Sequence, residues 1–206
     1  MKDSKEKKID GLILEIPPSV YEPAEDSFLL AENVEIKTND KILEIGSGSG
    51  YVSLYLTKNN PTAEFFCTDL NYKASRATLN NALKNSLNIH IITCDLFSSI
   101  IHQPFFDVIL FNSPYLPVKN SELESIAWAG GQDGLEVVES FIQQLKFVLK
   151  ENGKSYLVVS SLTDNQKLVS LIRENGFSYK IIDEVKAERE TILLYEMFID
   201  IVKLNK

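Results

Sequence analysis

The sequence is poor in cysteine and histidine and lacks long apolar runs, and each shortage excludes a class of protein. Two cysteines, Cys67 and Cys94, are too few for a secreted disulfide scaffold, so we expect a reducing location, the cytoplasm with a nuclear pool allowed. Their spacing, even with the histidines His90 and His102, matches no metal site, so we expect no resident metal. No apolar run approaches the ~20 residues of a membrane span, and the charged residues 1–8 do not resemble a signal peptide.

Basic charge is also in short supply. The formal net charge is −8 and the sequence pI is about 4.9. Proteins that bind nucleic acid usually carry a basic surface, because phosphate contacts dominate that affinity. Free DNA or RNA is therefore a poor candidate for the substrate. A chain of 206 residues, 44% hydrophobic and 24% charged, is typical of one globular domain.

Short apolar segments alternate with segments of helical periodicity after residue 40. The expected strands cover residues 41–45, 64–69, 89–94, 105–111 and 155–160. The expected helices cover residues 51–58, 72–85, 135–150 and 164–175, with Asn152-Gly153 as the stop signal after the third. Two further extended segments, 177–185 and 191–202, flank a turn and predict an antiparallel pair. The pattern indicates an α/β fold with a mostly parallel sheet.

A glycine-rich turn, residues 43–50, lies between the first expected strand and the first helix. Glycines there let the backbone approach a ligand closely. The dinucleotide fingerprint Gly-x-Gly-x-x-Gly does not fit, because Gly50 comes one residue too early. The carboxylate of Glu44 would repel a pyrophosphate but suits the positive end of S-adenosylmethionine. Taken alone, the turn is explained equally well as an ordinary tight turn.

Two more acids follow the next expected strands. Asp69 could accept hydrogen bonds from both hydroxyls of a ribose, and Asp95, followed by Leu96, could accept from an adenine amino group. Each acid by itself also fits a solvated strand end or a turn. Together with Glu44, however, they lie at the carboxyl ends of three successive strands, which is the ligand-binding edge of open α/β sheets.

The tetrapeptide Asn112-Ser113-Pro114-Tyr115 follows the fourth expected strand. An amide or aromatic NH2 is a poor nucleophile until its lone pair is turned toward the methyl donor. The side-chain oxygen of Asn112 and the backbone carbonyl of Ser113 could each accept one N–H of such a group and hold it in line. Pro114 would stiffen the turn and Tyr115 would offer a flat face. The alternative is a structural Asn-x-Pro turn.

The only tryptophan, Trp128, opens a glycine-rich segment that ends at Gly134, just before the expected helix 135–150. One interpretation is an ordinary loop in which Asp133 caps that helix. The other is a lid near the acceptor pocket.

Four segments in this order, residues 20–28, 43–50, 112–115 and 130–134, resemble the HemK family. More narrowly, they resemble its short eukaryotic and archaeal branch, which methylates class I translation release factors. The resemblance implies a class I, Rossmann-like methyltransferase domain over residues 18–206, behind an extension of residues 1–17. It implies a seven-stranded, mostly parallel sheet with helices on both faces and a C-terminal antiparallel hairpin. The target would be the side-chain amide (N5) of glutamine in a Gly-Gly-Gln tripeptide.

The resemblance also implies site residues. Asn112, Pro114 and Tyr115 would be catalytic and hold the glutamine amide. The residues expected to border S-adenosylmethionine are Tyr21, Pro23, Asp26, Ser27, Glu44, Gly46, Ser47, Gly48, Gly50, Asp69, Leu70, Asp95, Leu96 and Asn112. Ser113 stands where the family usually has proline. Serine has the same backbone carbonyl, so the pair of acceptors formed by Asn112 Oδ1 and this carbonyl (the amide clamp) is retained.

The resemblance to this branch also implies a heterodimer, because its members pair obligately with a small zinc-binding activator protein. In the usual methyltransferase strand order, the apolar strand 89–94 would be an exposed edge. A partner could cover it by strand addition.

Three other functions remain open. An adenine N6-methyltransferase would use the same clamp, but the acidic pI and the lack of a target-recognition domain disfavour it. A methyltransferase for lysine or a small molecule would not need a planar clamp. A non-catalytic binding module is disfavoured because Asn112 and Asp69 are intact.

Overall fold

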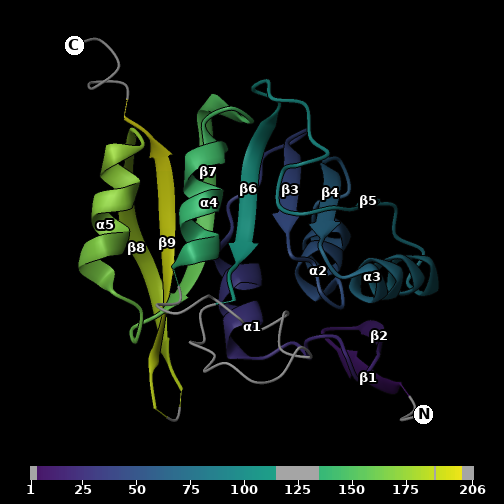
Figure 1. The fold of residues 1–206 in the computed structure, drawn as a ribbon. Helices are drawn as coiled ribbons and strands as arrows, with labels where there is room; N and C mark the ends of the chain where they lie inside the picture. The colour runs from purple at the N-terminus through teal and green to yellow at the C-terminus, as the bar shows by residue number, and fades with distance from the viewer. Residues whose placement is uncertain (1–3, 115–134, 188, 201–206) are drawn as a thin grey trace.

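The computed structural model describes residues 4–114, 135–187 and 189–200. Its centre is a seven-stranded sheet in the order β5-β4-β3-β6-β7-β9-β8 (Figure 1). The strands are β3 (Lys41–Ile45), β4 (Glu64–Asp69), β5 (His90–Thr93), β6 (Phe106–Asn112), β7 (Leu149–Ser160), β8 (Phe177–Lys186) and β9 (Thr191–Ile199). The first five are parallel, whereas β9 runs antiparallel to both β7 and β8. The expected mostly parallel sheet with a C-terminal hairpin is confirmed.

Helices cover both faces of the sheet (Figure 1). One face carries α1 (Glu25–Asn33), α2 (Tyr51–Asn59) and α3 (Tyr72–Lys84), and the other carries α4 (Glu136–Leu145) and α5 (Asn165–Glu174). Side chains alternate across a strand, so β3 serves both cores: Ile42 packs under α1 to α3, and Leu43 and Ile45 pack under α4 and α5. Among the helices that the structure describes, none has the length and apolar character needed to cross a membrane.

The chain begins with a hairpin that the sequence analysis did not predict. Strands β1 (Lys5–Ile9) and β2 (Leu12–Ile16) form a separate antiparallel sheet. Their two-residue turn, Asp10-Gly11, has positive φ at both positions, as a type I′ hairpin turn requires. The inward side chains of β2 are buried in the same core as α1 to α3.

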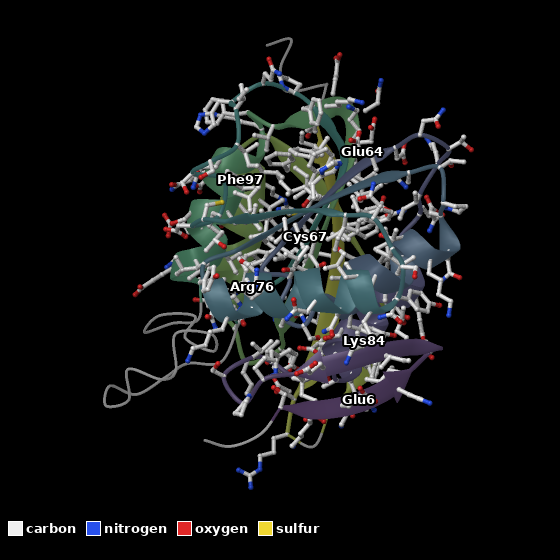
Figure 2. All side chains as sticks on the ribbon, turned by 90° about the vertical axis from the view of Figure 1, so that its right-hand side faces the viewer. Glu6, Glu64, Cys67, Arg76, Lys84 and Phe97 are labelled. Carbon is white, nitrogen blue, oxygen red and sulfur yellow. The ribbon has the colours of Figure 1, made fainter. Side chains whose placement is uncertain are left out.

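Asn81 of α3 and Asn85, which caps the end of α3, fasten this hairpin to the domain. Asn81 accepts from the backbone N–H of Glu15 and donates to its carbonyl, and Asn85 does the same for Ile13. Each side-chain amide thus bonds the backbone as a neighbouring strand would. Figure 2 shows the hairpin lying below α3, with Lys84 of α3 near Glu6 of β1, to which it forms an ion pair.

The helix predicted over residues 135–150 was too long. Helix α4 ends at Leu145, and Asn152-Gly153 lies within β7 rather than after a helix. Leu149 pairs with Phe106, and pairing with β6 resumes at Lys154 after a register shift. Strand pairing across β6 therefore overrides the helical spacing of apolar residues that led to the prediction. Helix α1 was not predicted at all.

Candidate functional site

The carboxyl ends of four parallel strands lie level with one another. Ile45 of β3 is opposite Thr68 of β4 and Phe111 of β6, and Asp69 is opposite Thr93 of β5. The segments that follow these strands therefore share one edge of the sheet. The glycine turn, Asp69, and residues 112–114 all lie at or directly after the ends of these strands.

The glycines of the turn have different roles. Gly46 and Gly48 have φ of 71° and 57°, and a Cβ added to either would meet no atom closer than 3.9 Å. Gly50 caps α2 with φ of 84°, and a Cβ there would lie 2.9 Å from Cγ2 of Thr78 in α3. A Cβ at Gly46 or Gly48 would make only ordinary van der Waals contacts, so these positions need glycine for their positive φ, whereas Gly50 also permits α2 to pack against α3.

Asp69 is joined directly to this turn. Its Oδ2 accepts from the backbone N–H of Gly48 at 2.9 Å, and its Oδ1 accepts from that of Asn71 at 2.8 Å. Burial raises the pKa of Asp69, and these two hydrogen bonds oppose the increase. A carboxylate held in this way keeps lone pairs for ribose hydroxyls.

Three further residues that were predicted to border the cofactor, Leu70, Asp95 and Leu96, follow β4 and β5 at this edge. Leu70 is 58% exposed directly after Asp69. Asp95 is exposed, and Leu96 is half-buried with φ of 42°. An exposed apolar side chain next to an acid, as at Leu70 and Asp69, suits a nucleoside, which has a flat base and a polar sugar.

Glu44 lies deeper than the sequence suggested. It is 2% exposed and alternates with Leu43 and Ile45, so its side chain points toward α2. One carboxylate oxygen accepts from the backbone N–H of Ser53 at 3.1 Å and from the Ser53 hydroxyl. Burial raises the pKa of Glu44 to about 8. The structure therefore gives Glu44 a role in anchoring α2, and its contact with a cofactor stays a prediction.

The segment that precedes α1 lies beside the glycine turn. Tyr21 is the nearest neighbour to the position of a Cβ on Gly48, at 4.0 Å. Its hydroxyl donates to Oδ2 of Asp26 at 2.8 Å, and the backbone N–H and hydroxyl of Ser27 both donate to Oδ1 of Asp26. Pro23 is half-buried in the same segment.

Asn112 is the last residue of β6. Its Nδ2 lies 3.5 Å from Oγ of Ser27, and its Oδ1 is buried without a hydrogen-bond partner in the described part of the chain. A buried acceptor with no partner is rare and needs an explanation, and an incoming N–H would supply one. Ser113 is buried, Pro114 is half-buried, and Tyr115 and the segment 128–134 lie outside the described residues.

Sequence reasoning missed three residues that support this edge. Asn71 caps α3, donates to the carboxylate of Asp69 and also to the carbonyl of Ser19. Thr78 donates from its hydroxyl to the carbonyl of Gly48, and Ser53 holds Glu44. Asn71 could have been found, because asparagine before a helix is a capping signal. Ser53 and Thr78 lie inside helices, where no local pattern marks such contacts.

Comparisons with known proteins agree with this geometry. The family model described as "Methyltransferase small domain" matches residues 21–183. A Methanocaldococcus jannaschii protein that carries the name of an N5-glutamine methyltransferase is 38% identical over 167 residues, which cover 79% of this chain and 83% of that one. The eRF1 methyltransferase catalytic subunit mtq2 of Schizosaccharomyces pombe is 32% identical over 211 residues, covering 87% and 89% of the two chains.

Solved structures extend the likeness to the fold. The E. cuniculi Mtq2-Trm112 complex, described as responsible for methylation of the eRF1 translation termination factor, contains a chain with a TM-score of 0.68 and 25% identity to this one. The match covers 87% of this chain and 98% of that one. The fold is thus that of the class I methyltransferases. The chain belongs to the methyltransferase small domain family, and within it to the branch of protein glutamine N5-methyltransferases that its motifs resemble.

Proposed function

We propose that this methyltransferase modifies the side-chain amide nitrogen of the glutamine in a Gly-Gly-Gln tripeptide of a class I release factor. The observation that carries the proposal is the buried, unpartnered Oδ1 of Asn112 at the carboxyl end of β6. An amide NH2 carries two N–H donors and needs two acceptors to fix its plane. Oδ1 of Asn112 is one, and the carbonyl of the next residue, Ser113, is the other in our proposal.

The residues at the sheet edge fit S-adenosylmethionine. The turn at Gly46 and Gly48, where no side chain extends from the backbone, would receive its amino-acid portion, and Asp69 would accept from the ribose hydroxyls. The adenine would lie near Leu70, Asp95 and Leu96. When bound, S-adenosylmethionine would supply an electrophilic methyl group to the amide nitrogen, with the thioether as leaving group and one N–H proton released to water. The chain itself orients the acceptor.

Asn112 and Ser113 have no need to remove a proton before transfer. By accepting both N–H groups they hold the nitrogen with its lone pair directed at the methyl group and stabilise positive charge that develops on the nitrogen. The nitrogen of a lysine amine is tetrahedral and does not need two acceptors in one plane. The pair of acceptors therefore favours a planar amide over lysine as the substrate group. An adenine amino group would fit the same two acceptors, and the names of the relatives favour the protein substrate.

A small activator protein is part of the proposal. Strand β5 is at the end of the seven-stranded sheet and pairs only with β4 among the described strands. Its Ile91 and Ile92 are half-buried. A sheet edge of this kind accepts a strand from a partner. The Mtq2 chain in the similar structure is in complex with Trm112. We propose that a zinc-binding protein of this kind adds along β5.

The test is mass spectrometry of a purified class I release factor after incubation with this chain, the activator and S-adenosylmethionine. We expect a gain of one methyl group on the peptide that contains Gly-Gly-Gln, and no gain when its glutamine is replaced by alanine. A parallel reaction with DNA and labelled cofactor addresses the adenine rival. Label on DNA with none on the release factor would overturn the proposal.

A further inference from the structure

The two ends of the Asn112 amide are in different surroundings. Nδ2 faces Oγ of Ser27 at 3.5 Å, and Oδ1 is buried with no partner in the described residues. An asparagine side chain can rotate by half a turn and exchange these ends at little steric cost, because oxygen and NH2 are nearly the same size. Something other than shape must therefore determine which end faces the acceptor group.

The hydrogen bonds around Ser27 determine it. The carboxylate of Asp26 can only accept, and its Oδ1 takes both the backbone N–H and the hydroxyl proton of Ser27, at 2.6 Å and 3.2 Å. Its Oδ2 accepts from the hydroxyl of Tyr21. A serine has only one hydroxyl proton. Once that proton points at Asp26, Oγ of Ser27 can only accept from Asn112.

The direction of the hydrogen bond between Ser27 and Asp26 therefore sets the direction of the hydrogen bond between Asn112 and Ser27. Because Oγ of Ser27 is an acceptor, the favourable orientation of Asn112 places NH2 toward Ser27 and Oδ1 away from it. Asp26 is 3% exposed and Ser27 is 5% exposed, so water does not compete freely for these bonds. The 3.5 Å separation is long, as hydrogen bonds at catalytic sites often are before a substrate binds.

We propose that Ser27 is a positioning residue that fixes the orientation of the Asn112 amide, so that its oxygen rather than its NH2 meets the acceptor nitrogen. The inference rests on the proposed function and adds to it the reason why the oxygen of Asn112, and not its NH2, faces the substrate. With the amide reversed, an NH2 donor would face the NH2 donor of the substrate. The acceptor nitrogen would then lose one of the two bonds that fix its plane.

The test is a double-mutant cycle on the methylation of the release factor by the activator complex. We expect Ser27→Ala to lower kcat about 10- to 100-fold, which corresponds to only about one tenth to one hundredth of the molecules presenting the oxygen of Asn112 in line once the Ser27 bond is gone. The KM for the cofactor should change less than about threefold. Ser27→Thr retains the hydroxyl and should recover kcat to within about threefold of the wild type. In an Asn112→Ala background, Ser27→Ala should cost nothing further, because Ser27 acts through Asn112.

A purely structural role for Ser27 predicts other results. A kcat unchanged by Ser27→Ala, or losses that multiply fully in the double variant, would overturn the inference. A parallel rise in the cofactor KM would assign Ser27 to cofactor binding instead and would also overturn it. If Ser27→Ala does not fold, Ser27→Cys keeps the volume with a poorer acceptor and carries the same expectation. Failure of the proposed function is distinguishable, because the wild type would then leave the release factor unmodified.

Discussion

The hydroxyl of Ser113 donates a 2.7 Å hydrogen bond to the backbone carbonyl of Val158. Val158 lies in β7 directly opposite Asn112 of β6, so the bond ties the turn after β6 to the neighbouring strand. Ser113 is the position where the HemK family usually has proline. Proline stiffens a turn by fixing φ, whereas here a buried hydroxyl holds the same turn from the side.

Replacing Ser113 tests whether its hydrogen bond to Val158 stabilises the turn as the proline ring of the family would. Ser113→Ala should lower the free energy of unfolding by about 1 kcal/mol and reduce kcat several-fold, because the turn that carries the clamp loses its tie to β7. Ser113→Pro should keep at least about half of the wild-type kcat. Chemical denaturation and initial methylation rates measure both. An alanine variant with wild-type rates, or an inactive but folded proline variant, would contradict this account.

The two halves of the site should respond separately to substitution. Asn112→Ala removes the buried acceptor and should lower kcat at least about 100-fold, to a residual rate, while leaving the dissociation constant of S-adenosylmethionine within about threefold. Asp69→Ala should weaken cofactor binding by at least about tenfold, since it removes the ribose acceptor and also the bonds to Gly48 and Asn71. Calorimetric titration with each variant compares the two. Equal losses of cofactor affinity would show that the halves are not separable.

The buried carboxyl of Glu44 should make stability depend on pH. Burial raises its pKa from the ordinary value of 4.5 to about 8, so the folded protein holds a proton that the unfolded chain releases. This favours the folded state below pH 4.5, and the advantage is lost as the pH rises toward 8. The free energy of unfolding should therefore fall over that range, by about 1 kcal/mol or more from this group.

Glu44→Gln is the matched control for that prediction. Glutamine keeps an acceptor oxygen for Ser53 and does not titrate. Urea denaturation of both proteins at several pH values from 5 to 8.5, a window we choose to bracket most of the shift, isolates the contribution of Glu44. The wild type should lose more stability than the variant as the pH rises. Parallel curves for the two proteins would mean that Glu44 titrates normally.

Gly46 and Gly50 share a positive φ but differ in their surroundings, which makes them a useful pair. Alanine at either position should cost about 1 kcal/mol of backbone strain. Gly50→Ala should cost about 1–3 kcal/mol more, because its Cβ would press against Thr78. Thr78→Ser removes the contacting methyl and should relieve part of that excess. Thermal unfolding of the three variants tests this, and equal melting temperatures for Gly46→Ala and Gly50→Ala would refute it.

Asn81 should be essential for docking the N-terminal hairpin. It is fully buried and bonds both backbone groups of Glu15, and it also donates to the carbonyl of Ser49 in the glycine turn. Asn81→Ala should lower the free energy of unfolding by about 2–3 kcal/mol. Asn80→Ala, at the exposed neighbouring position, should change it by less than about 0.5 kcal/mol. Hydrogen exchange of β2 should rise only in the first variant.

Local pattern was sufficient for much of the fold. Short apolar strands between helical segments indicated the parallel sheet, and the carboxyl ends of those strands indicated that Asp69 and Asn112 lie at the same edge of it. Local pattern failed where pairing with a distant strand decides the structure. Residues 146–150 have helical spacing of apolar residues, yet Leu149 extends as a strand because it pairs with Phe106. The hairpin was missed although its Asp10-Gly11 turn carried a recognisable signal.

By itself, the sequence determined the alternation of strands and helices and the chemical kinds of residue at the sheet edge, because both depend on periodicity and residue type. Only the tertiary structure decided how those residues are oriented. In the structure, Glu44 points inward and accepts from Ser53, and Gly50 allows α2 to pack against α3. The Asn112 amide is oriented by its contact with Ser27. Orientation depends on hydrogen bonds between residues far apart in the chain, such as the 85 positions that separate Ser27 from Asn112, and no local pattern records them.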